Sequence, residues 1–147
     1  GSLRDAISQP NRFVVFDVAG VINIKDRLVF KNNLYIAGQT APGEGITVYG
    51  NGVSFSGADN IIVRHMRFRM GHKGSSGKDA AGIAYGQNMI FDHCSFSWGL
   101  DETFSINPDN KGKHPDYITI SNCIMGQGLM PHKCWWFDAV RLYFPLS

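Results

Sequence analysis

The densest group of side chains able to bind an anion lies between residues 64 and 78. This stretch contains two histidines and five basic residues and no carboxylate before Asp79; the basic residues are Arg64, Arg67, Arg69, Lys73 and Lys78. Guanidinium and ammonium groups pair with carboxylates and phosphates. The net charge of the whole chain is only +2, and no nucleic-acid-binding motif accompanies the stretch, so nucleic acid is not indicated as a partner. We therefore expect these residues to face a specific anionic ligand.

A carboxylate and an imidazole, two groups able to move protons, are adjacent at Asp92 and His93. Neighbouring side chains of a strand point to opposite faces, so we expect that these two do not form a direct pair. We interpret them as structural, with one hydrogen-bonded inside a turn and the other on the outer face beside His65.

The strands that position these residues are predicted by a repeat in the sequence. Similar segments recur at spacings of 27, 28 and 28 residues; they begin at Asn33, Asn60, Asn88 and Asp116. Each segment starts with a turn residue and continues into β-branched and aromatic residues, which is typical of a strand. Three sets of equivalent positions then align: Ile62, Ile90 and Ile118; Phe68, Phe96 and Ile124; His65, His93 and Ser121. We further interpret Asn33, Asn60 and Asn88 as a side-chain ladder that holds turns.

A second short strand precedes the later segments, at residues 53–56, 82–85 and 103–106. Strands this short must bury their apolar side against the next repeat, as in a solenoid. Coils of about 27 residues without a helical pattern, and without the leucine pattern of leucine-rich repeats, predict an all-β fold. We expect a short, right-handed, single-stranded parallel β-helix of four or five coils, about 20 Å tall at the inter-strand spacing.

The N-terminal residues predict a cap for this stack. Ser2 and Asp5 resemble a capping box, and Leu3, Ala6 and Ile7 share one face of a short helix that Pro10 ends. Such a helix would cover the first coil, whose backbone is otherwise unpaired. Residues 13–18 and 21–24 are then the first two strands.

The repeat stops near the other end of the chain. A further copy is due near residue 144, but Pro145 cannot donate to a ladder there. We divide the chain into coils at 1–130 and an atypical tail or cap at 131–147. The tail carries Trp135, Trp136 and Phe137, whose apolar surface favours contact with another copy of the chain.

The cysteines and the apolar segments of the chain indicate neither a cysteine metal site nor a membrane-spanning segment. Cys94, Cys123 and Cys134 have no metal-ligand spacing, and we interpret them as small buried apolar residues. No segment is long and apolar enough to span a membrane. We expect one domain and a protein that acts outside the membrane.

Five segments of the chain resemble the pectate lyases of the β-helix group, in the order that the family has them: GSLRDA at 1–6, FDVAGVI at 16–22, IAGQTAPG at 36–43, VRHMRFR at 63–69 and FDHCSFSW at 91–98. The resemblance extends from the start of the chain to about Leu129. It implies a secreted enzyme that cleaves polygalacturonate by calcium-dependent β-elimination.

The resemblance also implies a calcium site. Asp79, Asp101 and Glu102 match the family's carboxylates, and hard oxygen ligands suit Ca²⁺. Asp79 and Asp101 are 22 residues apart, somewhat less than one coil, so both fit the same edge of neighbouring coils. This chain differs from the family at Ser97, because the family has a further carboxylate four residues before the position of Asp101.

The substrate residues that we expect are Arg64, Arg67, Arg69 and Lys78 from the basic stretch, together with Trp98, which suits either stacking on a sugar ring or core packing. The family's catalytic arginine lies in a segment that this chain lacks. Lys113, Lys133 and Arg141 are stand-ins by position alone, and we assign the base to none of them.

Two other functions stay open. One is a non-catalytic β-helix that holds acidic polysaccharide through the 64–78 stretch. The other is a family remnant without a ligand that associates with itself through its C-terminal tail.

Overall fold

The computed structural model describes residues 1–129 and the backbone of 140–142. Within these ranges the chain forms a short helix, α1 (Leu3–Ala6), a 3₁₀ turn, η1 (Gly38–Thr40), and three sheets of five parallel strands each.

Each coil contributes one strand to each sheet. The first sheet contains β1 (Arg12–Val15), β4 (Leu34–Ala37), β7 (Ile61–Arg64), β10 (Gly86–Asp92) and β13 (Pro115–Ser121). The second contains β2 (Gly20–Asn23), β5 (Ile46–Tyr49), β8 (Met66–Arg69), β11 (Ser95–Ser97) and β14 (Ile124–Gly126). The third contains β3 (Leu28–Val29), β6 (Val53–Ser54), β9 (Ala81–Ile83), β12 (Phe104–Ile106) and β15 (Val140–Leu142).

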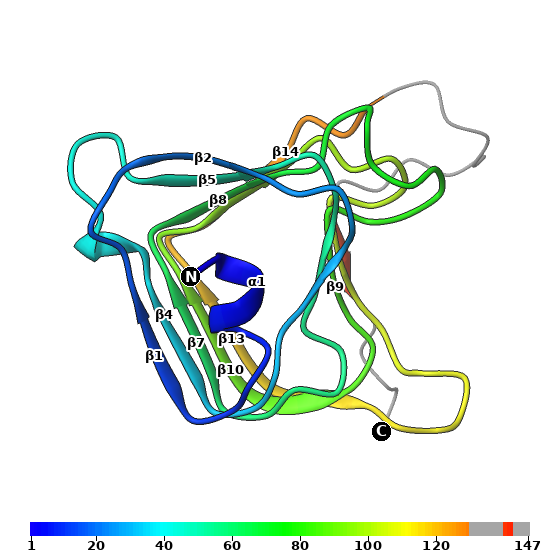
Figure 1. Ribbon diagram of the computed structural model, residues 1–147. Helices are drawn as coiled ribbons and strands as arrows, with labels where there is room; N and C mark the ends of the chain where they lie inside the picture. The colour runs from blue at the N-terminus through cyan, green and yellow to red at the C-terminus, as the bar shows by residue number, and fades with distance from the viewer. Residues whose placement is uncertain (130–139, 143–147) are drawn as a thin grey trace.

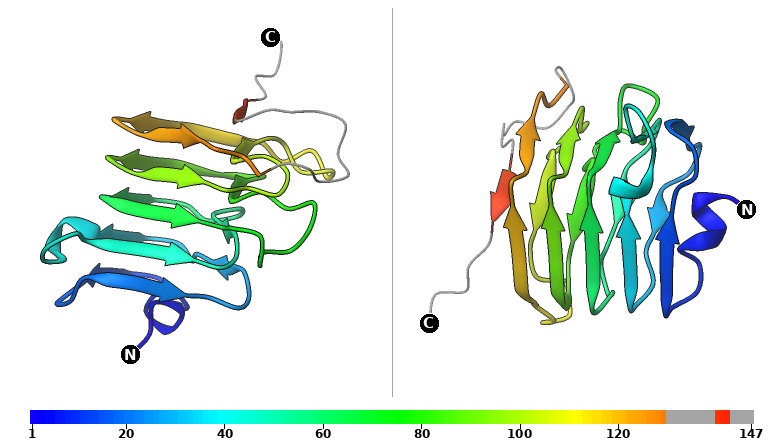
Figure 2. Two further views of the ribbon diagram at one scale, coloured as in Figure 1. Left: turned by 90° about the horizontal axis from the view of Figure 1, so that it is seen from above. Right: turned by 90° about the vertical axis from the view of Figure 1, so that its left-hand side faces the viewer.

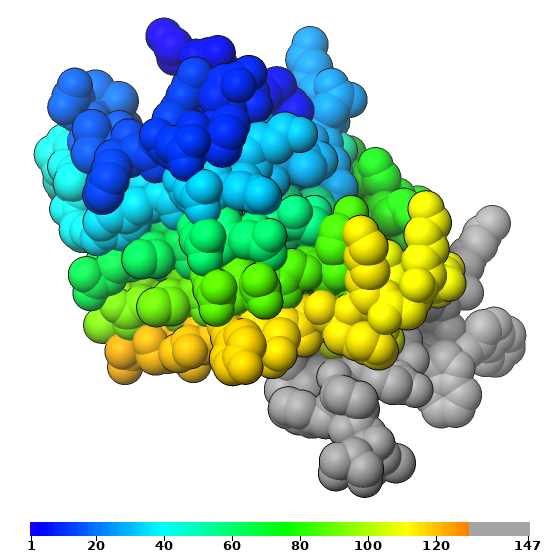
Figure 3. All heavy atoms as spheres, turned by 90° about the horizontal axis from the view of Figure 1, so that it is seen from below, coloured from blue at the N-terminus to red at the C-terminus, as the bar shows by residue number. Residues whose placement is uncertain are grey.

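The coils therefore stack in chain order around one axis, as the three-sided outline in Figure 1 and the side views in Figure 2 show. The space-filling view shows the same order as layers from blue to orange (Figure 3). The predicted parallel β-helix with an N-terminal helix is confirmed.

The core is a continuous apolar column inside the three sheets. Strands such as β7 and β8 alternate buried and more exposed residues, so every second side chain points inward. Five phenylalanines in this column are fully buried: Phe55, Phe68, Phe91, Phe96 and Phe104. Equivalent rings lie above one another; those of Phe68 and Phe96 stack with centroids 5.1 Å apart.

The predicted asparagine ladder is confirmed and includes one further member. Asn60 donates to Asn33 at 2.7 Å, Asn88 donates to Asn60 at 3.1 Å, and Asn33 donates to Asn11 at 2.8 Å. All four residues have a positive φ, between 56° and 62°. Asparagine adopts this left-handed conformation more readily than most residues, and its amide bonds the next coil.

The last repeat has a different spacing from the one predicted. Gly86 pairs with Pro115 and Met89 with Ile118, so β10 and β13 are 29 residues apart and the predicted spacing of 28 is wrong. The left-handed turn position is Tyr117, with φ 50°. Asp116, predicted by its type as the turn residue, instead accepts a hydrogen bond from the Tyr117 amide at 2.8 Å. The true equivalents of Ile90 and Phe96 are therefore Thr119 and Met125.

The helix α1 covers the first coil, as predicted. The Ser2 hydroxyl accepts a hydrogen bond from the Asp5 amide at 3.2 Å, and Leu3 and Ile7 are buried against the core. Figure 1 shows α1 across the open end of the column.

Most of the predicted tail lies outside the described residues, including Lys133, Cys134, the aromatic residues 135–137 and Pro145. Of this region the structure describes the backbone of β15, which pairs in parallel with β12. No helix in the described part of the chain is long and apolar enough to cross a membrane.

Replacing Phe91 by alanine should lower the free energy of unfolding by about 3–5 kcal/mol, because it removes a buried ring from the column. Phe13→Ala is the matched control, since that ring is 80% exposed; its effect should be well below that of Phe91→Ala. Urea unfolding followed by circular dichroism measures both. Equal losses would contradict a core centred on the inner phenylalanines.

Candidate metal and substrate site

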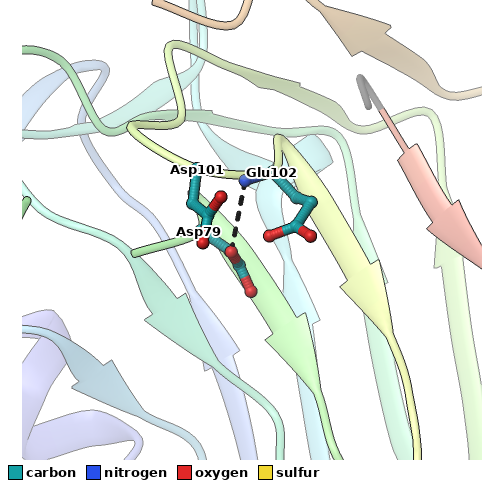
Figure 4. A group of neighbouring side chains, drawn as sticks. All are labelled: Asp79, Asp101 and Glu102. Carbon is teal, nitrogen blue, oxygen red and sulfur yellow. Dashed lines mark hydrogen bonds between the residues drawn. The ribbon is translucent and has the colours of Figure 1, made fainter. Parts of the chain in front are cut away.

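Three carboxylates gather where the second sheet passes into the third. Asp79 lies just before β9, and Asp101 and Glu102 lie before β12 on the next coil. Each offers an oxygen within 4.8 Å of the other two. Figure 4 shows the three side chains converging from two neighbouring loops. The coil stacking thus brings together residues that are 22 positions apart in the sequence.

Backbone pairing between the two loops fixes this arrangement. The amide of Ala80 donates to the Glu102 carbonyl at 3.1 Å, and the Glu102 amide donates to Asp79 Oδ1 at 3.3 Å. The other oxygen of Asp79 accepts a hydrogen bond from the Ser105 hydroxyl of β12. Asp79 is therefore oriented before any ligand binds.

The acidic groups of the cluster act on one another. Burial, a hydrogen bond with Asp79 and the charges of Asp79 and Asp101 raise the pKa of Glu102 from 4.5 to about 7. One proton or one cation relieves such repulsion. Three carboxylates around one point are also the donors that a hard divalent cation prefers, so these residues fit calcium, with water or substrate completing its coordination.

A cation that the sequence did not reveal lies beside the cluster. The Arg27 side chain crosses from the first coil and donates to the Val53 carbonyl at 3.0 Å. A β-carbon at Gly82 would lie 3.3 Å from Arg27 Nη2 and 3.4 Å from Asp79 Oδ2, so the missing side chain leaves space between these groups. Burial lowers the pKa of Arg27, and the charge of Asp79 opposes that effect. Arg27 is 52 residues before Asp79, and no motif marks it.

The basic stretch does not form one surface. Arg64, on the first sheet, pairs with Asp92 at 2.8 Å. Arg67 and Arg69 lie on the second sheet, where they bond Thr47 Oγ1 at 2.9 Å and Ser95 Oγ at 2.8 Å. Only Lys78, exposed beside Asp79, lies next to the carboxylates. A turn between β7 and β8 separates the predicted ligand-binding residues.

Trp98 begins the loop that carries Asp101. Its ring meets Tyr49 edge-on, with centroids 6.3 Å apart, and the Arg69 guanidinium lies 6.0 Å from the ring. The ring is only partly buried, so it packs on the outer surface of the second sheet. Ser97, where the family has a carboxylate, is buried at the end of β11.

The prediction that Asp92 and His93 cannot pair is wrong. His93 Nδ1 lies 2.7 Å from Asp92 Oδ1. The strand ends at Asp92, and His93 has a φ of 53°, so the alternation of a continuous strand does not apply. The predicted alignment of His93 with His65 on the outer face is confirmed, because the two rings stack with centroids 4.7 Å apart.

Comparison with known proteins shows which proteins the chain is similar to. No family model matches the chain. Proteins named "Probable pectate lyase C" from Aspergillus flavus, Aspergillus fumigatus and Aspergillus terreus are 64%, 62% and 60% identical to it over 134 residues. The match covers 91% of this chain and 31% of each relative. Over these 134 residues the chain is homologous to proteins named as pectate lyases. It spans about a third of the length of these relatives.

The raised pKa of Glu102 links the carboxylate cluster to the stability of the fold. A carboxyl whose pKa is higher in the folded chain binds its proton more tightly there, so its contribution to stability is complete below its unfolded pKa and is lost as the pH rises through its folded pKa. For Glu102 this window extends from 4.5 to about 7.

Glu102→Gln should therefore stabilise the metal-free protein at about pH 8 and have little effect at about pH 4. The gain should be at most about 1 kcal/mol, because solvent screens a group this exposed. Urea unfolding in the presence of a chelator measures it. The control, Glu44→Gln on an exposed loop, should shift stability equally at both pH values. A Glu102→Gln effect that does not change with pH would contradict the charge repulsion.

Proposed function

We propose that this chain is the part of a pectate lyase that holds calcium and binds polygalacturonate for cleavage by β-elimination. The observation that carries the proposal is the carboxylate cluster of Asp79, Asp101 and Glu102 on neighbouring coils, in a chain more than half identical to proteins named pectate lyases. We extend the proposal to residues 1–130 as the coils and 131–147 as an atypical tail.

Calcium bound there would neutralise a uronate carboxylate and make the adjacent C5 proton more acidic. Residues of this chain hold the calcium-binding carboxylates in place. The Ser105 hydroxyl donates a hydrogen bond that orients the Asp79 carboxylate. Glu102 would lose its proton when the cation binds. The polymer would lie across the corner between the second and third sheets, beside Lys78 and Trp98.

We propose no residue among 1–129 as the base that removes the C5 proton. Arg141 pairs by backbone register with Ser105, so β15 continues the same sheet beside the carboxylate cluster. Lys113 lies elsewhere, with its ammonium 4.9 Å from the Tyr85 ring. This geometry disfavours Lys113 as a base at the cluster.

We further propose that the protein is secreted, because its substrate would be an extracellular polymer. Self-association through the C-terminal tail is a separate proposal. Light scattering at micromolar protein concentration tests it, and a monomer mass would exclude it.

Calcium binding tests the site directly. Asp101→Asn should weaken calcium binding by about tenfold or more, because ligand charge sets affinity for this ion. Asp17→Asn, on an exposed loop far from the cluster in sequence, should leave the dissociation constant unchanged. Isothermal titration calorimetry measures both. The cluster is not the calcium site if the two variants bind equally well.

Activity tests the reaction. Polygalacturonate incubated with the protein and calcium should yield an unsaturated uronide, seen as a rise in ultraviolet absorbance, and chelator or Asp101→Asn should abolish the rise. Binding of polygalacturonate with no rise in absorbance would favour the non-catalytic alternative.

A further inference from the structure

The corner between the first and second sheets has an unusual pair of residues. His65, His93 and Asn122 occupy equivalent positions there, with φ of 53°, 53° and 52°. Asparagine and glycine adopt this left-handed conformation most readily. Two successive coils nevertheless place histidine where the third has asparagine. A strained position that keeps a chemically active side chain suggests a function for that side chain.

The two imidazoles stack face to face and are open to solvent. Their planes are 12° apart and their centroids 4.7 Å apart. The His93 side chain is 49% exposed, and His65 is also exposed. Both rings line one groove of about 610 Å³, so their free edges open into the same space.

A fixed carboxylate orients one of these rings. Asp92 lies 2.7 Å from His93 Nδ1 and is itself bound by Arg64 at 2.8 Å and by Asn122 at 3.0 Å. Because this carboxylate lies against Nδ1, the Nε2 atom on the other side of the His93 ring is the one open to a ligand. The same geometry occurs in carboxylate–histidine–metal arrangements.

The groove has room for an ion and its water ligands. Its wall is the loop that carries η1, which projects from this corner (Figure 1). Gln39 and Glu44 of that loop line the groove together with Arg67 and Asn122. The carboxylate cluster lies at a different corner, between the second and third sheets, so the two places are separate.

We propose that His65 and His93 form a binding site for a divalent transition-metal ion that prefers imidazole, of the class of Zn²⁺ and Cu²⁺. Each ring nitrogen would lie about 2.0–2.1 Å from the ion. Because the rings are stacked and an imidazole nitrogen binds in the plane of its ring, both exposed side chains must turn to direct a nitrogen at the same ion. Water completes the coordination, and Asp92 acts as a positioning residue through His93.

The experiment uses the variants that the third coil suggests. His65→Asn and His93→Asn keep a residue suited to the left-handed turn, so both should fold with no loss of stability in urea unfolding. Zinc titration by calorimetry should show one site in the wild type, and each variant should weaken it by about tenfold or more. The electron paramagnetic resonance spectrum with one equivalent of Cu²⁺ should show two nitrogen ligands in the wild type and one in each variant.

Two controls separate this site from others. His114→Asn, an exposed histidine in another loop, and Asp101→Asn in the carboxylate cluster should leave zinc binding unchanged. Zinc binding that survives both histidine variants, or that Asp101→Asn removes, would overturn the proposal. So would a wild-type copper spectrum with fewer than two nitrogen ligands, a result that needs no variant to fold.

Discussion

The parallel backbone ladder between successive coils is the constraint on which the rest of the structure depends. It places each residue directly beside its equivalent in the next coil, at the inter-strand distance of about 4.8 Å. Equivalent residues of successive coils therefore form columns that run along the axis of the β-helix. Inside, the columns are phenylalanines and aliphatic residues; at one corner they are asparagines that bond one another. At the other corners the same rule brings together carboxylates and imidazoles.

Two groups of acidic side chains have different surroundings in the structure. Asp92 is surrounded by donors from three coils, and Arg64 balances its charge. This carboxylate is therefore already satisfied, and it serves to hold His93. In the other group, Asp79 accepts hydrogen bonds from a hydroxyl and a backbone amide, and burial together with the charges of Asp79 and Asp101 raises the pKa of Glu102. A carboxylate cluster left in that condition is suited to receive a cation.

The surroundings of the carboxylate cluster depend on glycine as much as on charge. Gly82 lies inside β9, where a glycine weakens a strand and often marks close approach of another group. Here its missing side chain makes room for the Arg27 guanidinium, for Asp79 and for the Ser105 hydroxyl, 3.2 Å from where a β-carbon would lie. The basic stretch at 64–78 has the opposite character. Its arginines bond residues of neighbouring coils and lie on two different sheets.

The sequence by itself determined the coils, the inward columns, the N-terminal cap and the carboxylates that meet, because a repeat of near-constant length fixes what stacks on what. Only the tertiary structure decided the last register, where Tyr117 rather than Asp116 takes the turn, and the pairing of Asp92 with His93 across a change of φ. The tertiary structure also brings Arg27 beside the carboxylate cluster. The reason is physical: composition and spacing report which residues recur, whereas backbone torsion at a single turn residue decides which way each side chain points.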